Sequence, residues 1–294
     1  MSKIQEALKK IQGADHESHR GGQAEEQPLA QVTVSQAEEG VEPAPQLDNR
    51  LVVVDREQLR KAGLMAPEDQ ERHVAHQYRI IKRPILNLAT GHAADRPEHA
   101  NLVMIASALP GDGKTFNAIN VALSIAVEKD NSVLLVDADV AKPHISKLFG
   151  LSDEPGLIDL LVQHDLDIES VVIKTDVPGL SILPAGHPHE FATELLASRR
   201  MAEAVTRLAE AVPDRIVIFD SPPLLVTSES RVLASRMGQI VLVVCAGKTP
   251  QQAVVSAVDS LDSSKAINVI LNQAGTILGE GGYGGYGYGY GVTS

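Results

Sequence analysis

The sequence has little sulfur, few aromatic rings and a deficit of positive charge. One cysteine in 294 residues excludes an internal disulfide and favours a reducing compartment. The formal net charge of −12, from 26 basic and 38 acidic residues, disfavours a general nucleic-acid-binding protein, which needs a basic face. No apolar run approaches the ~20 residues that cross a bilayer, and the first ten residues lack the apolar core of a secretory signal. These absences predict a cytoplasmic protein.

The few aromatic residues are unevenly placed. There is no tryptophan, and four of the five tyrosines lie in the last twelve residues. These four are Tyr283, Tyr286, Tyr288 and Tyr290. Seven of the eleven residues 281–291 are glycine, which has the most backbone entropy to lose on ordering. Residues 276–294 are therefore predicted to form a flexible tail. The span of 17 residues from Gln273, before the tail, to Tyr290 gives a coil dimension of roughly 20–25 Å.

The first fifty residues predict little folded structure. Ile4, Leu8 and Ile11 recur at helical spacing, so residues 1–12 favour a short amphipathic helix. Residues 13–49 are polar, acidic and interrupted by prolines, which indicates a disordered linker. Next, residues 51–54 form a β-branched run that predicts an edge strand. A helix is then expected from about residue 67 until Pro84 breaks or kinks it.

From residue 100 onward, short apolar runs alternate with helical stretches. The apolar runs cover 102–106, 133–136, 180–183, 216–219, 240–245 and 269–271. The predicted helices include 117–127, 191–211 and 251–261. Fully apolar strands alternating with helices are typical of a parallel sheet covered on both faces. We therefore predict an α/β domain over residues 51–275, with a doubly wound, mostly parallel sheet of the P-loop NTPase type.

The first apolar run leads into the segment Ala108-Leu109-Pro110-Gly111-Asp112-Gly113-Lys114-Thr115. It fits the phosphate-loop pattern G-x-x-x-x-G-K-[ST] except for alanine in place of the first glycine. The glycines let backbone N–H groups surround a phosphate, the lysine supplies positive charge, and the threonine hydroxyl suits Mg²⁺. The predicted nucleotide-binding residues are Pro110, Gly111, Asp112, Gly113, Lys114, Thr115 and Phe116. A glycine turn beside a surface lysine is the alternative.

Two further strands end in aspartates. Asp137 and Asp139 follow the second apolar run, and Asp220 follows the fourth, ahead of Ser221-Pro222-Pro223. Ligands of open α/β sheets bind at the carboxyl ends of the strands. There, a carboxylate is able to hold Mg²⁺ or to accept a proton from an attacking hydroxyl. Taken singly, Asp139 could instead cap a helix and Asp220 could simply end its strand.

Together these elements resemble the bacterial tyrosine autokinases (BY-kinases) of capsule and exopolysaccharide loci. That family has a phosphate loop, a D-x-D strand, a D-x-P-P strand and a C-terminal tyrosine cluster, and all four occur here in that order over residues 68–294. Residues 137–143 and 78–84 also look like the stand-alone kinases of exosortase-associated (PEP-CTERM) exopolysaccharide clusters. The resemblance implies ATP and Mg²⁺ as cofactors and an autophosphorylating protein-tyrosine kinase.

The resemblance also implies residue roles. Asp137 and Asp139 are expected to serve the metal and the incoming tyrosine hydroxyl, and Asn272 to contact adenine. The expected catalytic residues are Lys114, Asp137, Asp139 and Asp220. The expected metal ligands are Thr115, Asp139 and Asp220. The expected phosphate acceptors are Tyr283, Tyr286, Tyr288 and Tyr290.

The resemblance further implies a ring-shaped homo-oligomer and a separate membrane polysaccharide chain-length protein (a co-polymerase) as activator. The chain would then sit at the inner face of the cell membrane through that partner. Two departures from the family pattern bear on this. Ala141 replaces an arginine that usually follows D-x-D, and the oligomer helix reads His76, Arg79 and Lys82 instead of E-x-x-R-x-x-R.

Two other functions fit part of the sequence. A partition-type ATPase of the Min/Par kind shares the motif order, but it needs a lysine early in the phosphate loop, where Leu109 stands here. It would also leave the tyrosine tail unexplained. The other is a non-catalytic, nucleotide-dependent scaffold, in which Ala141 would mark the loss of catalytic activity.

Overall fold

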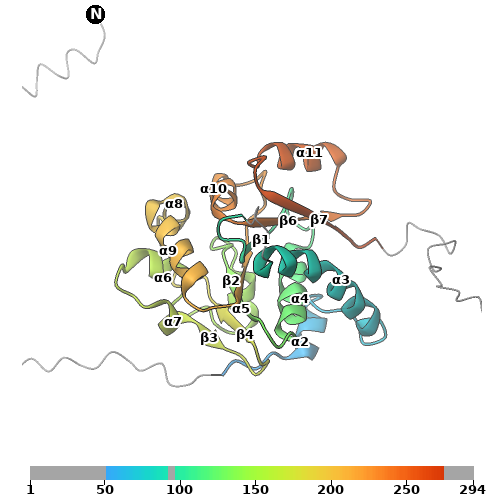
Figure 1. Cartoon of the computed structure of the whole chain (residues 1–294), viewed down its shortest axis with the longest axis horizontal. Helices are drawn as coiled ribbons and strands as arrows, with labels where there is room; N and C mark the ends of the chain where they lie inside the picture. The colour runs from blue at the N-terminus through green and yellow to red at the C-terminus, as the bar shows by residue number, and fades with distance from the viewer. Residues whose placement is uncertain (1–50, 92–96, 275–294) are drawn as a thin grey trace, which may run out of the picture. The chain divides into compact units, whose positions relative to one another are not determined.

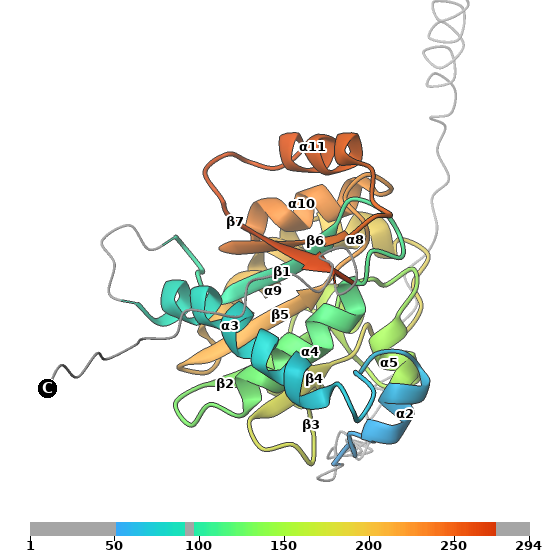
Figure 2. The same cartoon turned by 90° about the vertical axis from the view of Figure 1, so that its right-hand side faces the viewer.

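The computed structural model describes residues 51–91 and 97–274. These residues contain a seven-stranded sheet in the order β3-β4-β2-β5-β1-β6-β7 (Figures 1 and 2). Neighbouring strands pair parallel, except that β3 runs antiparallel to β4. The strands are β1 Leu102–Ser107, β2 Ser132–Asp137, β3 Ile173–Lys174, β4 Leu180–Leu183, β5 Arg215–Asp220, β6 Gln239–Cys245 and β7 Ala266–Asn272. The predicted doubly wound, mostly parallel sheet is confirmed.

Helices cover both faces of the sheet. Figure 1 shows α3 and α4 on one side of it and α6, α8 and α9 on the other. The longer helices are α3 Glu71–Thr90, α4 Lys114–Ala126, α9 Arg199–Glu210, α10 Ser228–Arg236 and α11 Gln251–Asp259. The shorter ones are α2 Arg56–Lys61, α5 His144–Leu148, α6 Leu157–Val162, α7 Ile168–Val171 and α8 Ala192–Ala197. This arrangement buries the apolar side chains of the central strands on two sides.

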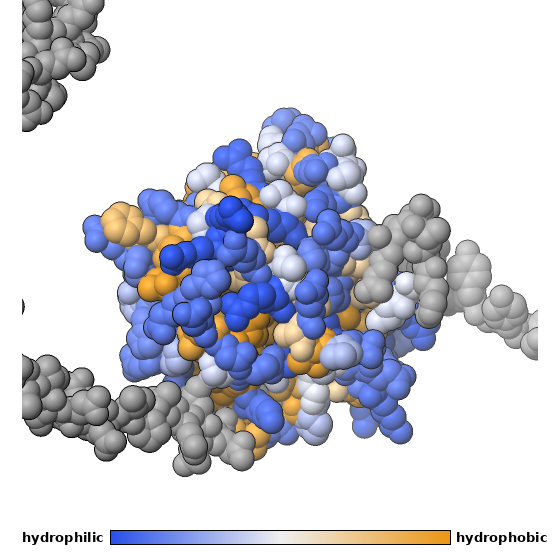
Figure 3. Space-filling view, turned by 60° about the vertical axis from the view of Figure 1, so that its left-hand side comes forward, coloured by the Kyte–Doolittle hydropathy of each residue, from blue (hydrophilic) through white to orange (hydrophobic). Residues whose placement is uncertain are grey.

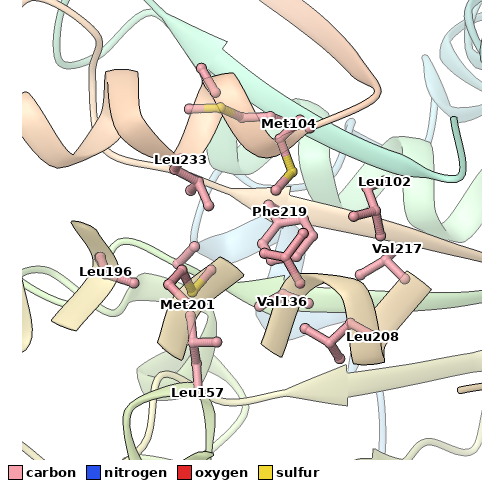
Figure 4. Packing of buried hydrophobic residues seen from close by; sticks show 14 of the residues in the cluster. Leu102, Met104, Val136, Leu157, Leu196, Met201, Leu208, Val217, Phe219 and Leu233 are labelled. Atoms are coloured by element: carbon pink, nitrogen blue, oxygen red, sulfur yellow. The ribbon is translucent and has the colours of Figure 1, made fainter. Parts of the chain in front are cut away.

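The core is split by the sheet into two clusters. Met104 of β1 and Phe219 of β5 pack with Met201 of α9, as Figure 4 shows. Their strand neighbours Val103 and Ile218 point the other way and pack with side chains of α3 and α4. Alternate side chains of a strand face opposite sides, so a fully apolar strand needs a cover on each. This explains why β1, β2 and β5 read as continuous apolar runs.

The surface is more hydrophilic than the core. The face in Figure 3 is mostly hydrophilic, with small apolar patches between polar ones. Within residues 51–91 and 97–274, no helix combines the length and the apolar character that a bilayer span demands.

Of the two predicted effects of Pro84, a break or a kink, the break does not occur, because helix α3 continues past this proline. Proline removes one intrahelical hydrogen bond. The residues beyond it, Ile85 and Ala89, are buried in the core, and this burial offsets that loss. The helix also begins at Glu71, after a turn over 67–70, rather than at residue 67.

Two other boundaries differ from expectation. The predicted helix over 191–211 is two helices, because Ser198 is extended and its hydroxyl accepts the Met201 N–H at 3.3 Å as the cap of α9. Residues 51–54 form no strand, and Val52 makes only a single parallel bridge to Thr175 beyond β3. The predicted N-terminal helix, the linker and the tyrosine tail lie outside the described residues.

Candidate nucleotide and metal site

The phosphate loop connects β1 to α4 and has the backbone that its glycines predict. Gly111 has φ of 82° and Gly113 has φ of 100°, in the left-handed region that favours glycine. A Cβ on Gly113 would overlap the side-chain amide of Asn272. Ala108, the departure from the motif, is fully buried and has no positive φ, so its position does not need glycine.

Asp112 ties this loop to two other segments. Its carboxylate accepts the Leu109 N–H at 3.1 Å and the Thr249 hydroxyl at 2.7 Å. Its carbonyl accepts the Asn272 amide at 2.9 Å. The loop is therefore held in place by the β6–α11 connection and by the end of β7. Asn272 lies at the phosphate loop, and its predicted contact with adenine stays a prediction.

Two carboxylates meet at the carboxyl edge of the sheet. Asp137 and Asp220 are register partners on β2 and β5, and both are buried. The Thr115 hydroxyl donates to Asp220 Oδ2 at 2.7 Å. Ser146 donates to Asp137 Oδ2 through its N–H at 2.8 Å and its hydroxyl at 2.7 Å. On each carboxylate the other oxygen, Oδ1, is buried and has no hydrogen-bond partner within residues 51–91 and 97–274.

Orphaned, buried carboxylate oxygens beside a hydroxyl fit a hard divalent cation. Mg²⁺ usually takes only one or two protein carboxylates and leaves other positions to water and substrate phosphates. Among the residues described, no group of three or more histidine, cysteine or acidic side chains is placed to hold a metal. The residues present therefore suit Mg²⁺ bound together with a nucleotide, rather than a metal held by protein alone.

The charges at this edge are poorly solvated. Burial raises the pKa of Asp220 to about 7 and that of Asp137 to about 6, where hydrogen bonds from Ser146 oppose the rise. Burial also raises the pKa of the half-buried Asp139, against the charge of Lys114. Burial lowers the pKa of Lys114, only 8% exposed, while Asp220, Asp139 and Asp112 act in the opposite direction. A cation binding here would relieve the excess of carboxylates.

Helix α3 is linked to the phosphate loop by its buried Tyr78, through Asn117 of α4. The Tyr78 hydroxyl donates to Asn117 Oδ1 at 2.8 Å, and the Asn117 amide donates to the Gly113 carbonyl at 2.9 Å. The Phe116 ring packs against Tyr78 with centroids 6.4 Å apart. The Phe116 side chain therefore faces α3, and only the backbone N–H of Phe116 is expected to bind a phosphate.

The three residues of α3 at the positions of the family's oligomer motif do not share one exposed face. His76 and Arg79 are exposed. Lys82 is buried, donates to the Ser124 carbonyl of α4 at 2.6 Å and pairs with Glu128. The cause is helical spacing, since Lys82 follows Tyr78 by four residues and shares its inward face.

Sequence reasoning missed three residues of the site. Ser146 and Thr249 hold Asp137 and Asp112, and the Lys248 ammonium lies 3.4 Å from the position that a Cβ on Gly111 would take. The rule that ligands bind where parallel strands end could have pointed to Lys248 and Thr249, which follow β6. No comparable signal marks Ser146. The predicted acceptors Tyr283, Tyr286, Tyr288 and Tyr290 lie outside the described residues.

Comparisons with known proteins agree with this geometry. A family model described as an AAA domain matches residues 100–260. The tyrosine-protein kinase YwqD of Bacillus subtilis is 32% identical over 200 residues, which cover 67% of this chain and 80% of YwqD. The succinoglycan biosynthesis transport protein ExoP of Rhizobium meliloti is 31% identical over 59% of this chain, but that match covers only 22% of ExoP.

A solved structure extends the likeness to the fold. The crystal structure of the VpsO kinase domain matches with a TM-score of 0.58 and 31% identity, over 70% of this chain and 98% of that domain. The phosphate loop and the aspartates at 137, 139 and 220 lie within the matched residues 100–260, and a curated relative and a solved domain are both named as kinases. The chain therefore belongs to the bacterial tyrosine-protein kinase family.

Proposed function

We propose that this protein is an ATP-dependent protein-tyrosine kinase that phosphorylates its own C-terminal tyrosines and regulates exopolysaccharide biosynthesis. One observation carries the proposal. A glycine-rich phosphate loop with a buried lysine lies beside two buried carboxylates, each of which has one oxygen without a partner. Such a site suits a nucleotide polyphosphate with its Mg²⁺.

Each side chain has a role in this reaction. Lys114 and the backbone N–H groups of residues 111–115 bind the phosphates at the start of α4. Thr115, Asp220 and Asp137 supply the oxygens for Mg²⁺, which, when bound, neutralises charge on the phosphate oxygens. Asp137 replaces Asp139 of the predicted metal ligands, because Asp137 is the register partner of Asp220. The half-buried Asp139 is more accessible than Asp137, so it suits the incoming phenol.

The group transfer balances with these residues. The tyrosine oxygen forms a bond to the γ-phosphorus of ATP, and the bond from that phosphorus to the oxygen bridging to ADP breaks. The phenolic proton passes to a carboxylate, for which Asp139 is the proposed acceptor. Catalysis is mainly positioning and charge neutralisation, which is the usual case for phosphoryl transfer.

The test is autophosphorylation of the full chain. Incubation with ATP and Mg²⁺ is expected to give phosphotyrosine, and Lys114→Met is expected to abolish it. Replacing the four tail tyrosines with phenylalanine keeps the length of the tail and should remove most of the labelling while nucleotide binding remains. Bound nucleotide without phosphotyrosine would contradict the proposal, and ATP hydrolysis without phosphotyrosine would favour a partition-type ATPase.

The link to polysaccharide rests on a relative. ExoP is named for succinoglycan biosynthesis and transport, which supports a role in exopolysaccharide production. We propose that a membrane chain-length protein activates this kinase, recruits it to the inner face of the membrane and favours a homo-oligomeric ring. Deleting that partner in native cells should move the kinase from the membrane fraction to the soluble fraction and lower its phosphotyrosine content. An unchanged distribution would contradict recruitment.

A further inference from the structure

Ser146 is a buried serine that belongs to no nucleotide-binding motif, yet it contacts an acidic site residue twice. It lies on the short helix α5 and is only 2% exposed. Both its N–H and its hydroxyl donate to the same oxygen of Asp137, at 2.8 and 2.7 Å. Two donors on one oxygen fix the orientation of the carboxylate more firmly than one does.

A third contact fixes the direction in which the Ser146 hydroxyl donates. The Ala185 N–H donates to Ser146 Oγ at 2.9 Å. Ala185 is itself held, because its carbonyl accepts the Ile158 N–H of α6 at 2.9 Å. A hydroxyl has one proton to donate. With a donor already on its oxygen, Ser146 is left to donate that proton to Asp137.

The consequence appears on the other oxygen of the carboxylate. Since Ser146 occupies Oδ2, the atom that remains buried and without a partner among the residues that the structure describes is Oδ1. Neutral donors stabilise the carboxylate without cancelling its charge. Asp137 thus presents a fixed, charged oxygen next to Asp220, its register partner on β5.

We propose that Ser146 is a positioning residue that orients Asp137 toward Mg²⁺ and thereby sets how much Mg²⁺ the kinase needs. This inference rests on the proposed function. Partners of this kind behind a ligand change metal affinity or activity by about 10- to 100-fold when they are removed. The effect should fall on Mg²⁺ rather than on ATP itself, because the side-chain hydrogen bonds of Ser146 within the described part of the chain go to Asp137 and Ala185 and not to the phosphate loop.

The experiment is a Mg²⁺ titration of autophosphorylation by the full chain at saturating ATP. Ser146→Ala should raise the Mg²⁺ concentration for half-maximal activity by about tenfold. It should leave the KM for ATP, measured at saturating Mg²⁺, near the wild-type value. Ser146→Thr restores a hydroxyl and should return the Mg²⁺ requirement toward wild type.

The matched control is Thr175→Val. Thr175 is buried, and its hydroxyl donates to the Leu180 carbonyl at the amino end of β4, away from the site. This variant should leave the Mg²⁺ requirement unchanged even if its melting temperature falls as far as that of Ser146→Ala. Should Ser146→Ala not fold, Ser146→Cys keeps the size, weakens the donor and should raise the requirement in the same way.

Three results would overturn the inference. They are an unchanged Mg²⁺ requirement in a folded Ser146 variant, an equal change in Thr175→Val, and no recovery in a folded Ser146→Thr. Wild-type protein without phosphotyrosine would instead contradict the proposed function. In that case, calorimetry of ADP binding at increasing Mg²⁺ gives the same comparison of Ser146 variants.

Discussion

The carboxyl ends of β2 and β5 carry two aspartates in matching positions, and different parts of the chain hold them. Asp137 and Asp220 are register partners. On each, one oxygen is hydrogen-bonded and the other is buried without a partner in the described part of the chain. Asp220 is held by Thr115, which belongs to the phosphate loop itself. Asp137 is held by Ser146, nine residues further along the chain and outside every motif.

The two carboxylates are therefore oriented by two separate parts of the structure. The Asp220 side depends on the phosphate loop, so nucleotide binding and the arrangement of that carboxylate are coupled through one hydroxyl. The Asp137 side is fixed by α5 and by the segment after β4, independently of the loop. Because the two supports are separate, variants of each should have separable effects.

The largest expected effect comes from removing either charge. Asp137→Asn and Asp220→Asn retain an acceptor for Ser146 and Thr115 but lose the charge that a cation needs. Each should lower the rate of autophosphorylation by about 100-fold or more, measured as phosphotyrosine formed per unit time. Asp176→Asn is the control, because Asp176 accepts the Val54 N–H and follows β3 near the amino end of β4, at the edge of the sheet opposite to these carboxylates.

Unequal losses of activity in Asp137→Asn and Asp220→Asn would show that the two aspartates do not contribute equally to the metal site. If Asp137→Asn kept most of the activity, the cation would depend on β5 and the phosphate loop alone. Full activity in both variants would rule out the assignment of these oxygens to the metal.

The second effect is a pH dependence of stability in the absence of ligand. Burial raises the pKa of Asp220 to about 7 and that of Asp137 to about 6, from 3.8. The folded protein therefore binds protons more tightly than the unfolded chain, and its stability should fall as pH rises from about 4 to about 7. For Asp220 the upper bound of this loss is about 4 kcal/mol.

Denaturant unfolding at several pH values compares the two carboxylates. Asp220→Asn should flatten the fall in stability more than Asp137→Asn, because two hydrogen bonds from Ser146 oppose the rise in the Asp137 pKa and one from Thr115 opposes that of Asp220. Equal flattening would mean that those hydrogen bonds do not distinguish the two sites. A wild-type stability that rises with pH over this window would contradict the burial argument itself.

Much of the fold could be predicted from the sequence. Apolar runs such as 216–219 correctly predicted the buried central strands, because a strand that is buried on both faces consists mainly of apolar residues. Short or partly polar elements were missed. Strand β3 has two residues, and α5 has five, so neither is long enough to show a period.

The site could be predicted only where a motif fixes its residues. The phosphate loop and Asp220 follow from local spacing, because their geometry depends on neighbours in sequence. The contact from Ser146 to Asp137 depends on how α5 packs back against β2. Lys82 is a second case: it stands in the motif that the resemblance links to oligomer formation, but the packing of α3 on α4 buries it. Tertiary contacts of this kind have no local signal.

A smaller effect concerns the phosphate loop that holds the β5 side. Gly113→Ala places an L side chain at φ of 100° and against the Asn272 amide. Backbone strain of this kind costs about 1–3 kcal/mol, and the contact with Asn272 adds to it. Gly63→Ala is the matched control, since Gly63 has φ of 69° but nothing within 4 Å of the new Cβ.

Thermal unfolding and nucleotide titration of both glycine variants separate strain from contact. Gly113→Ala should lose more stability than Gly63→Ala and should also lose nucleotide affinity. Equal losses of stability would show that the contact with Asn272 costs nothing. Unchanged nucleotide affinity would show that the loop tolerates displacement.

The smallest effect extends the comparison from carboxylates to cations. Lys114 is a buried cation within the motif, whereas Lys248 is an exposed one outside it whose ammonium lies near Gly111. Among the described residues no ion pair involves Lys248, although Thr249 next to it is bonded to Asp112. A cation held beside a phosphate loop and without a carboxylate partner should attract a nucleotide.

Because it is exposed, Lys248 should contribute modestly. Lys248→Ala should weaken ATP binding about two- to fivefold at low salt, and the difference should shrink as salt screens it. Lys129→Ala is the control, since Lys129 is exposed in the connection that leads into the amino end of β2, opposite to the site. If Lys129→Ala weakens binding equally, general charge attraction is responsible. If neither variant changes affinity, Lys114 alone attracts the nucleotide. Residues outside the motifs would then contribute to the site by holding a carboxylate, as Ser146 does, and not by adding a cation.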